Sequence, residues 1–403
     1  MEQLKGFTVP GEEGKVCKLL KALYGLKQAG RQWHAHLHNT LQELGFMKNI
    51  SNNVSIFIKR HEGGDPIIIL VYVNDIAIFG KSDTISEVKT QIAAHYKTTD
   101  LGEINHFLGI HITRDHLKKT LYIDQMHYIK RMLTRYDMEQ CLPMYTPFAA
   151  STILAANREP ESDTALTSRY QQIVSSLMYV MLGSRPDICF AVNKLSQYGL
   201  KPTEWHLIAA QQVLRYLSTT CNSKLCYGKN DSTELIAYSD SDWASDPDNR
   251  HSMTGYTFIL SGGAIAWATQ KQRTVVLSST EAEYMAITEC AKHAQWTISL
   301  LRQLNFDIDL PLDPHCDLCG ARAISINNVF HKRTKHIDIR YHYIRDVINA
   351  GTVEVIEVST KRNVTDFLTK SLPRQQHENL SRKIRLTDDP IEGECCERSG
   401  TLV

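Results

Sequence analysis

The sequence lacks the features of a secreted or membrane-spanning protein. Its N-terminus, MEQLKGFTVPGEEG, does not show the basic and then apolar pattern of a signal peptide. No apolar run approaches the roughly 18 residues that span a bilayer. The ten cysteines follow no regular framework, which favours reduced thiols in a chain of this length. We therefore expect an intracellular protein, cytoplasmic or nuclear, with no membrane partner.

The sequence also has almost no net charge and no internal repeat at a solenoid period. Lys and Arg total 45 against 44 Asp and Glu, so any binding of nucleic acid must come from local basic patches. What is present is an ordinary globular composition, with 42% hydrophobic and 22% charged residues among 403. This length allows two or three domains with hydrophobic cores.

One cysteine pair has metal-ligand spacing. Cys316 and Cys319 form a single CxxC, but a zinc site needs a second pair, and Cys395-Cys396 are adjacent. We therefore interpret Cys316 and Cys319 as small buried thiols.

The first third of the chain predicts helices around a hairpin. Apolar residues recur every three or four positions from residue 16 to 46, which predicts a helix interrupted near Gly25 and Gly30. The stretch LVYVNDIAIFG places Asn74 and Asp75 at a tight turn between two apolar strands. Asn-Asp is ordinary turn chemistry, so by itself this stretch indicates structure rather than function.

The remaining chain changes character twice. Residues 143–166 have the polar, proline-containing composition of a linker, and residues 170–217 predict helices. Then the strands ELIAYSD, GYTFILSG and AIAWATQ follow in quick succession, and a long helix spans about residues 280–304. Antiparallel strands followed by alternating helices and strands predict a mixed sheet covered by helices.

Two acids stand where this sheet would meet its long helix. Asp240 ends the first strand, and Asp242 would point the same way only if the strand continues, so Asp240 is preferred. Glu283 heads the apolar, sheet-facing stripe of the helix. The alternative for Glu283 is a capping partner of Thr280, whereas Glu281 fits a capping box with Ser278.

Two more acids stand at later element ends. Asp317 closes the segment PHCD, and Asp366 opens the final helix. Either acid alone could be an N-cap or a first-turn residue favoured by the helix dipole. Together with Asp240 and Glu283 they form the type of carboxylate set that holds two divalent ions for phosphodiester hydrolysis. Magnesium suits such oxygen ligands.

Five motifs in this half resemble the ribonuclease H domain of Copia-type LTR retrotransposon Pol polyproteins. They are YSDSDWASDPDNRHSMTGY, VVLSSTEAEYMA, the CD of HCDLCGARAI, VFHKRTKHIDIRYHYIRD and TDFLTKSLP. The resemblance implies cleavage of the RNA strand of RNA-DNA hybrids with two Mg²⁺ (or Mn²⁺) ions. The acids that it implies as metal ligands and catalytic residues are Asp240, Glu283, Asp317 and Asp366. The family usually has Asn and Gln where this chain has Leu318 and Cys319, which affects local substrate contacts first.

The first half resembles the reverse transcriptase palm, thumb and connection of the same polyproteins. The motifs are KLLKALYGLKQAGRQWH, YVND, GEINHFLGIHI, YTPF and YQQIVSSLMYVMLGSRPDICFAV. The family carries Tyr-Val-Asp-Asp at the hairpin, so Asn74 replaces the first acid and Asp75 is the second. A third acid would be expected before Met1. We therefore expect a degenerate, inactive polymerase site at Asn74 and Asp75.

The resemblance sets the expected organisation, an α+β part followed by an α/β part. We expect a truncated reverse-transcriptase palm and thumb at residues 1–147 and a linker with a helical connection-like segment at 148–230. A ribonuclease H-like mixed sheet covered by helices is expected at 231–385, followed by a tail at 386–403.

Basic residues supply the expected nucleic-acid contacts. Lys21, Lys27 and Arg31 lie on the helix that borders nucleotide and template in the family, although a solvated basic face is an equal alternative. Two further sets could line backbone-tracking grooves: Arg114, Lys118, Lys119, Lys130, Arg131 and Arg135 in the first half, and Lys332, Arg333, Lys335 and His336 in the second. We expect the indoles of Trp33, Trp205 and Trp267 to be core aromatics rather than base-stacking platforms.

The leading hypothesis is a ribonuclease H that acts on RNA-DNA hybrids without polymerase activity. Its expected partner is RNA-DNA hybrid or other nucleic acid. Other Pol or Gag products of the element are further candidate partners. The alternative is a catalytically silent nucleic-acid-binding remnant of a decayed element, which would show salt-sensitive binding without turnover.

Overall fold

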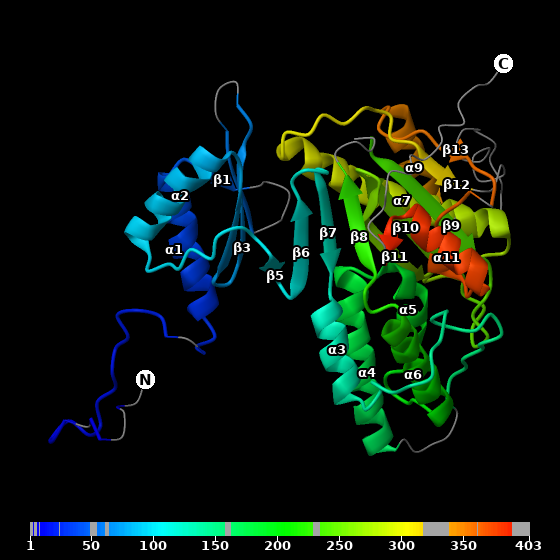
Figure 1. Cartoon of the computed structure of the whole chain (residues 1–403), viewed down its shortest axis with the longest axis horizontal. Coiled ribbons are helices and arrows are strands. Elements are labelled where there is room, and N and C mark those ends of the chain that lie inside the picture. Colours follow the sequence, from blue (N-terminus) through cyan, green and yellow to red (C-terminus); the bar gives the residue numbers. More distant parts are fainter. Residues whose placement is uncertain are drawn as a thin grey trace. The chain divides into compact units, whose positions relative to one another are not determined.

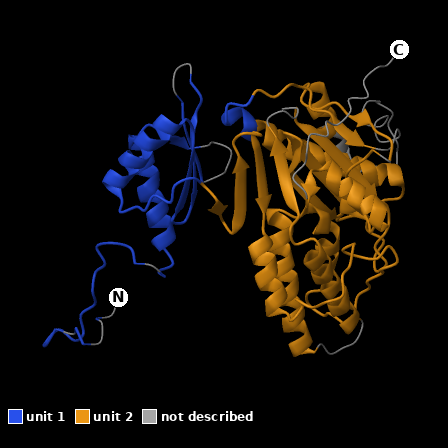
Figure 2. Cartoon of the chain, viewed as in Figure 1, with its two compact units in different colours: residues 1–103, 300–306 blue, residues 104–299, 307–403 orange. Residues whose placement is uncertain are grey.

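The computed structural model describes residues 3, 6–7, 9–23, 25–48, 55–60, 64–157, 163–228, 234–316, 338–360 and 362–388, with the side chains of 338–342 left aside. These residues form two compact units, shown in separate colours in Figure 2. Unit 1 is residues 1–103 with 300–306, and unit 2 is residues 104–299 with 307–403.

Unit 1 is an antiparallel sheet packed against two helices (Figure 1). Its strands, in sheet order, are β1 (Met47–Lys48), β2 (Ile56–Lys59), β3 (Ile67–Tyr72) and β4 (Asp75–Phe79). The helices are α1 (Ala29–Glu43) and α2 (Ser82–His95). Alternate β3 residues are buried, and they pack with Leu37 and Leu41 of α1 and Val88 and Ile92 of α2 in one core. Both helices therefore cover the same sheet face.

The predicted helix across residues 16–46 is wrong in its first part. Helix α1 begins at Ala29, and Lys21 and Lys27 lie before it in an exposed, non-helical segment. Gly25 adopts φ +90°, a conformation that a helix cannot include. The interruption expected near Gly25 is thus the place where the helical pattern fails.

The hairpin between β3 and β4 is confirmed, but its turn is one residue earlier than expected. Tyr72 pairs with Asp75, so Val73 and Asn74 form the turn, and Val73 adopts φ 54°. The indole N–H of Trp33 donates to the carbonyl of Val73 at 2.6 Å and fastens the turn to α1. Asp75 is therefore the first residue of a strand rather than part of the turn.

Unit 2 contains a first antiparallel sheet together with a group of helices. In sheet order the strands are β14 (Leu386–Thr387), β8 (Lys224–Gly228), β7 (Thr120–Asp124), β6 (Ile110–Asp115) and β5 (His106–Phe107). The helices are α3 (Met126–Arg135), α4 (Thr164–Gly183), α5 (Cys189–Ser196) and α6 (Glu204–Thr219), with a 3-10 turn at Pro186–Ile188. Strands β8 and β14 were not predicted. They are short and pair with each other across a long stretch of chain.

The second sheet of unit 2 is the predicted mixed sheet (Figure 1). Its order is β11 (Gly263–Lys271), β10 (Met253–Leu260), β9 (Ile236–Asp242), β12 (Pro314–Cys316) and β13 (Ile356–Glu357). Strands β9, β10 and β11 are antiparallel, whereas β12 and β13 run parallel to β9. The helices are α7 (Ser279–Gln303), α9 (Asp338–Asn349), α10 (Asp366–Thr369) and α11 (Arg374–Lys383).

The helices α3–α6 and the second sheet share one hydrophobic core. Leu177 of α4 and Leu214 of α6 belong to the same buried cluster as Ile259 of β10 and Phe367 of α10. This sharing explains why residues 104–230 belong to one compact unit with the second sheet. The division at residues 147 and 230 stays a prediction.

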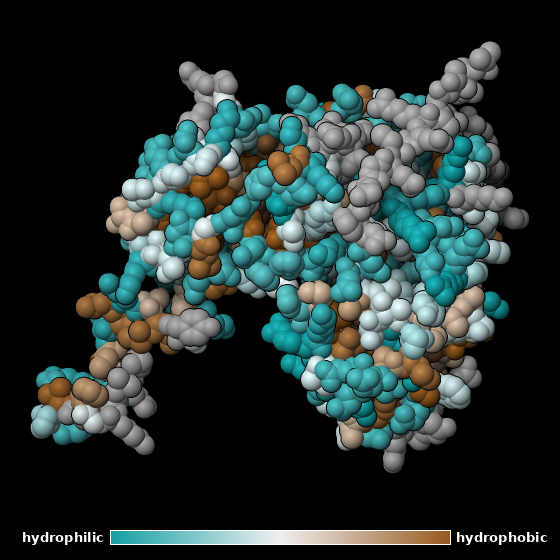
Figure 3. Space-filling model, in the orientation of Figure 1, coloured by the Kyte–Doolittle hydropathy of each residue, from teal (hydrophilic) through white to brown (hydrophobic). Residues whose placement is uncertain are grey.

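The three tryptophans that were predicted to be core aromatics differ in environment. Trp33 packs against the core of unit 1, and the indole N–H of Trp267 donates to the Met181 carbonyl at 3.0 Å. Trp205, at the start of α6, is 76% exposed, so its assignment to the core was wrong. Figure 3 shows hydrophilic and hydrophobic residues intermixed on the visible face of the helices α3–α6. None of the described helices is long and apolar enough to cross a membrane.

Candidate active site on the second sheet

Asp240 lies in the middle of the second sheet, on β9. It pairs with Gly255 of β10, and only 2% of its surface is exposed. Strand β9 continues to Asp242, so alternation places Asp240 and Asp242 on the same face of the strand. Burial raises the pKa of Asp242 above its ordinary value, with Asp366 adding to the effect and Lys370 opposing it. The strand therefore directs two carboxyl groups toward α10.

Glycine on β10 allows α10 to approach this strand closely. A Cβ atom at Gly255 would lie 2.8 Å from both the Cβ of Leu368 and the Cγ2 of Thr369. The Thr369 hydroxyl donates to Oδ2 of Asp240. Three residues before α10 begins, the Asn363 side-chain amide donates to the Ser239 carbonyl at 2.9 Å. The α10 segment is thus attached to β9 at two successive residues.

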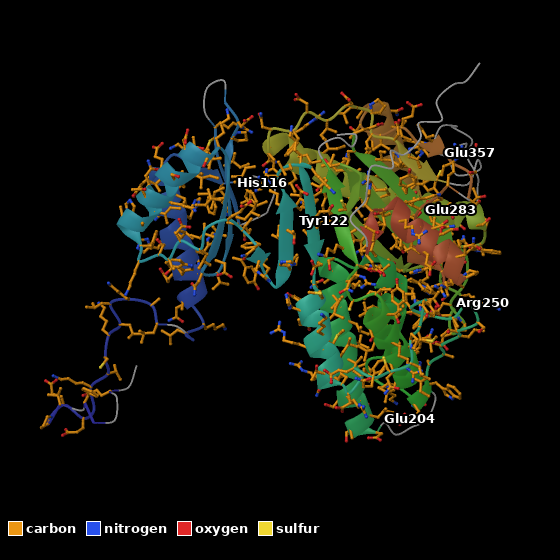
Figure 4. The ribbon with its side chains drawn as sticks, in the orientation of Figure 1. His116, Tyr122, Glu204, Arg250, Glu283 and Glu357 are labelled. Atoms are coloured by element: carbon orange, nitrogen blue, oxygen red, sulfur yellow. The ribbon has the colours of Figure 1, made fainter. Side chains whose placement is uncertain are left out.

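Glu283 reaches the same strand from α7 (Figure 4). Its side chain is 4% exposed, and Oε1 accepts a hydrogen bond from the Ser241 amide at 2.9 Å. Ser241 is the residue after Asp240, so the prediction that Glu283 faces the sheet is confirmed. The residues of the predicted stripe are all buried: Ala286, Ile287, Cys290, Ala291, Ala294, Ile298 and Leu301.

The capping alternative for Glu283 is wrong, because the cap of α7 uses other residues. The Ser278 hydroxyl accepts from the Glu281 amide at 3.2 Å, and Oε2 of Glu281 accepts from the Leu277 amide at 2.7 Å. This is the predicted capping interaction of Glu281, except that its carboxylate binds the amide of Leu277, one residue before the cap Ser278. Glu281 therefore stabilises the start of the helix, while Glu283 accepts a hydrogen bond from the backbone of β9.

Asp366 is the first residue of α10 and is 1% exposed. The N-cap is Thr365, so Asp366 is not the cap but an acidic residue in the first turn, which was the other alternative. Its Oδ1 lies 2.9 Å from Nζ of Lys370, and its Oδ2 accepts from the Gln376 amide at 3.2 Å. Burial would lower the pKa of Lys370, but the charges of Asp240, Asp366 and Asp242 raise it. The charges of three carboxylates thus stabilise the protonated form of Lys370.

The donor set fits a hard divalent cation, since Asp240, Glu283 and Asp366 offer only carboxylate oxygens. In the described part of the chain, no three His, Cys, Asp or Glu side chains stand as a group that could hold a metal ion. Oxygens of Asp240 and Asp366 are instead engaged by Thr369 and Lys370. Metal binding would require these contacts to yield.

Several predicted residues lie outside the described residues. These are Asp317, Leu318, Cys319, Lys332, Arg333, Lys335 and His336. Cys316 is described, and its side chain is buried in a small core with Tyr284 and Ile287 of α7. This agrees with the interpretation of Cys316 as a buried thiol.

The predicted polymerase residues lie in unit 1. Asn74 and Asp75 are exposed at the hairpin, and Lys21, Lys27 and Arg31 are exposed as well. The residues of the other predicted basic groove belong to unit 2 and are all exposed: Arg114, Lys118, Lys119, Lys130, Arg131 and Arg135. Exposure suits either a solvated face or contact with phosphate groups, so their role in binding stays a prediction.

Sequence reasoning missed Gly255, Thr369, Lys370 and Gln376 as parts of this site. The signal for Lys370 was available, because it follows Asp366 by four residues, a common spacing of ion pairs, and is the C-cap of α10. Gly255 and Gln376 become meaningful only when β10, α10 and α11 are placed together.

The strand order of the second sheet is that of a ribonuclease H-like fold, present in this chain together with a reverse transcriptase-like region. Residues 1–150 match the family model described as "Reverse transcriptase (RNA-dependent DNA polymerase)". The chain is 39% identical over 383 residues to the retrovirus-related Pol polyprotein from transposon TNT 1-94 of Nicotiana tabacum. That match covers 94% of this chain and 29% of the polyprotein.

A putative transposon Ty5-1 protein of Saccharomyces cerevisiae is 31% identical over 291 residues, which is 72% of this chain and 93% of that protein. The chain belongs to the family of Copia-type retrotransposon Pol proteins. It spans less than a third of the length of the tobacco polyprotein.

Among solved structures, LC11-RNase H1 in complex with an RNA/DNA hybrid matches 34% of this chain and 94% of its own. The identity is 11% and the TM-score 0.26, so the fold assignment rests on the strand order instead.

Proposed function

We propose that unit 2 cleaves the RNA strand of RNA-DNA hybrids. The observation that carries this proposal is the burial of three acids around β9, each at most 4% exposed: Asp240 on the strand, Glu283 bound to the Ser241 amide, and Asp366 on α10, whose Thr369 contacts Asp240. Burying several carboxylates in one place opposes folding unless cations or donors compensate. Such an arrangement is explained by chemistry that needs concentrated negative charge.

The cation that fits this chemistry is Mg²⁺ or Mn²⁺, held by Asp240, Glu283 and Asp366, with Asp317 as a further ligand on the family pattern. When bound, divalent ions activate water and stabilise the leaving oxygen of a phosphodiester. The chain's own contribution is orientation. The Ser241 amide fixes the Glu283 carboxylate, the Thr369 hydroxyl orients Asp240, and Gln376 holds Asp366.

We infer further that the hairpin of unit 1 does not support DNA polymerisation. Asn74 offers an uncharged amide where the family carries an aspartate, and a carboxylate within about 4 Å of a cation contributes on the order of 4 kcal/mol per unit charge at an effective dielectric of about 20. Positioning by Trp33 keeps the turn in place but supplies no charge. The purified protein should not extend a DNA primer on an RNA template, and clear extension would contradict this inference.

The cleavage proposal is tested with a hybrid whose RNA and DNA strands carry different labels. In Mg²⁺, the protein should shorten the RNA and leave the DNA intact, and Asp240→Asn should abolish cleavage while retaining the fold, checked by circular dichroism. Salt-sensitive binding of the hybrid without cleavage would favour the alternative, a silent nucleic-acid-binding module.

A further inference from the structure

Lys370 places a positive charge among the proposed metal-binding acids. Its Nζ lies 2.9 Å from Oδ1 of Asp366, and the charges of Asp240 and Asp242 act on it as well. The residue before it, Thr369, donates to Asp240. One turn of helix therefore brings both a hydroxyl and an ammonium group to the acids.

The two partners differ in how firmly they are held. The Asp366 side chain is 2% exposed and is also bound by Gln376, whereas the Lys370 side chain is 37% exposed. A lysine has a flexible four-carbon stem and can move its ammonium into water, whereas the buried Asp366 carboxylate keeps its hydrogen bond from Gln376 to Oδ2. Lys370 can thus withdraw without disturbing Asp366.

The other charged groups near the acids do not replace this role. Lys194 of α5 acts on Asp242, but its ammonium donates to Asp246 at 2.8 Å, and Lys271 lies 2.8 Å from the same carboxylate. These two lysines are held by Asp246, which lies in the loop after β9. Lys370 is the lysine paired directly with one of the proposed metal ligands.

We propose that Lys370 is the internal counter-ion of Asp366, and that a divalent cation must displace its ammonium from this carboxylate in order to bind. Lys370 thereby sets the affinity of the site for divalent cations. The identity of these ligands rests on the proposed function. The displacement requires no bond making or breaking beyond the ion pair.

The test compares Lys370→Gln and Lys370→Arg with the unchanged protein. Mn²⁺ binding is measured by electron paramagnetic resonance, and thermal unfolding is followed in a chelator. Lys370→Gln removes a competing charge, so Mn²⁺ should bind on the order of tenfold more tightly, since the partly exposed pair is screened by water. In the chelator, Lys370→Gln should unfold at a lower temperature, because the acids lose their counter-ion. Lys370→Arg should stay close to the unchanged protein in both measurements.

Lys271→Gln is the matched control. It also removes a lysine from a buried aspartate at 2.8 Å, but that aspartate is Asp246, outside the proposed ligands. It should lower the unfolding temperature without tightening Mn²⁺ binding.

Equal or weaker Mn²⁺ binding by Lys370→Gln would overturn the inference, as would tightening of the same size in Lys271→Gln. Absence of Mn²⁺ binding in every variant would overturn it too. The cleavage assay is scored separately, so tighter binding without cleavage would retain the counter-ion and reject the ribonuclease.

Discussion

Asp246 forms a buried ionic centre that fastens the loop after β9 to the rest of unit 2. Its side chain is fully buried and lies 2.8 Å from the ammonium groups of both Lys194 and Lys271. Its other oxygen accepts from the backbone amides of Asp248 and Asn249. Asp246→Asn should keep the amide contacts, because the asparagine oxygen can still accept them, but it removes the charge.

The ion pairs of Asp246 determine how much stability Asp246→Asn loses. Burial alone would raise the pKa of Asp246, but the hydrogen bonds from Lys194 and Lys271 dominate and lower it from 3.8 to about 2. That difference corresponds to about 2 kcal/mol of stability at neutral pH. Leaving two partly buried lysines without their partner adds to the loss, since breaking a buried pair costs about 3–5 kcal/mol. We expect Asp246→Asn to lose about 2–4 kcal/mol.

The sign of the pH dependence follows from the lowered pKa. The folded protein holds Asp246 ionised below the pH at which the unfolded chain takes up a proton, so the stabilisation is complete above an unfolded pKa of 3.8. It is lost as the pH falls from about 4 toward 2. Urea unfolding of the unchanged protein and of Asp246→Asn should be measured at a series of pH values. The difference in their free energies of unfolding should be constant above about pH 5 and should shrink below about pH 4. Equal stability at pH 7, or a difference that grows on acidification, would refute this reasoning.

Further predictions concern the joints of unit 2. Trp267→Phe should cost about 1 kcal/mol in urea unfolding, because the Met181 carbonyl loses its indole donor; no change would show that water replaces the bond. Ser278→Ala should also cost about 1 kcal/mol, through loss of the α7 cap; an unchanged unfolding midpoint would contradict this. A fragment of residues 104–403 should unfold cooperatively, whereas residues 231–403 should not, because the helices α3–α6 supply half of the shared core. Cooperative unfolding of the shorter fragment would contradict the shared core.

The strands and the long helix of the second sheet were predictable because their patterns are local. The apolar strand that carries Asp240 and the helical stripe headed by Glu283 each show which face is buried within one element, although β9 continues two residues beyond the predicted end at Asp240. The pairing of β8 with β14, in contrast, joins residues 224–225 to 386–387, and no periodicity carries that information.

The errors have local physical causes. The apolar spacing before Ala29 resembled a helix, but Gly25 at positive φ interrupts it. The exposed Trp205 follows the N-cap of α6, where a large residue can satisfy the helical pattern without facing the core. The site itself was predictable only as a set of acids, because Thr369 and Lys370 acquire their roles from the close approach that Gly255 allows.

The most direct test of the central claim compares two buried glutamates two residues apart on α7. Glu283→Gln removes the carboxylate that faces β9, whereas Glu281→Gln alters the helix cap. With a strand-labelled RNA-DNA hybrid in Mg²⁺, Glu283→Gln should abolish RNA cleavage, and Glu281→Gln should retain it at temperatures where the protein is folded. Equal cleavage by the two variants would contradict the assignment of the chemistry to the acids around β9.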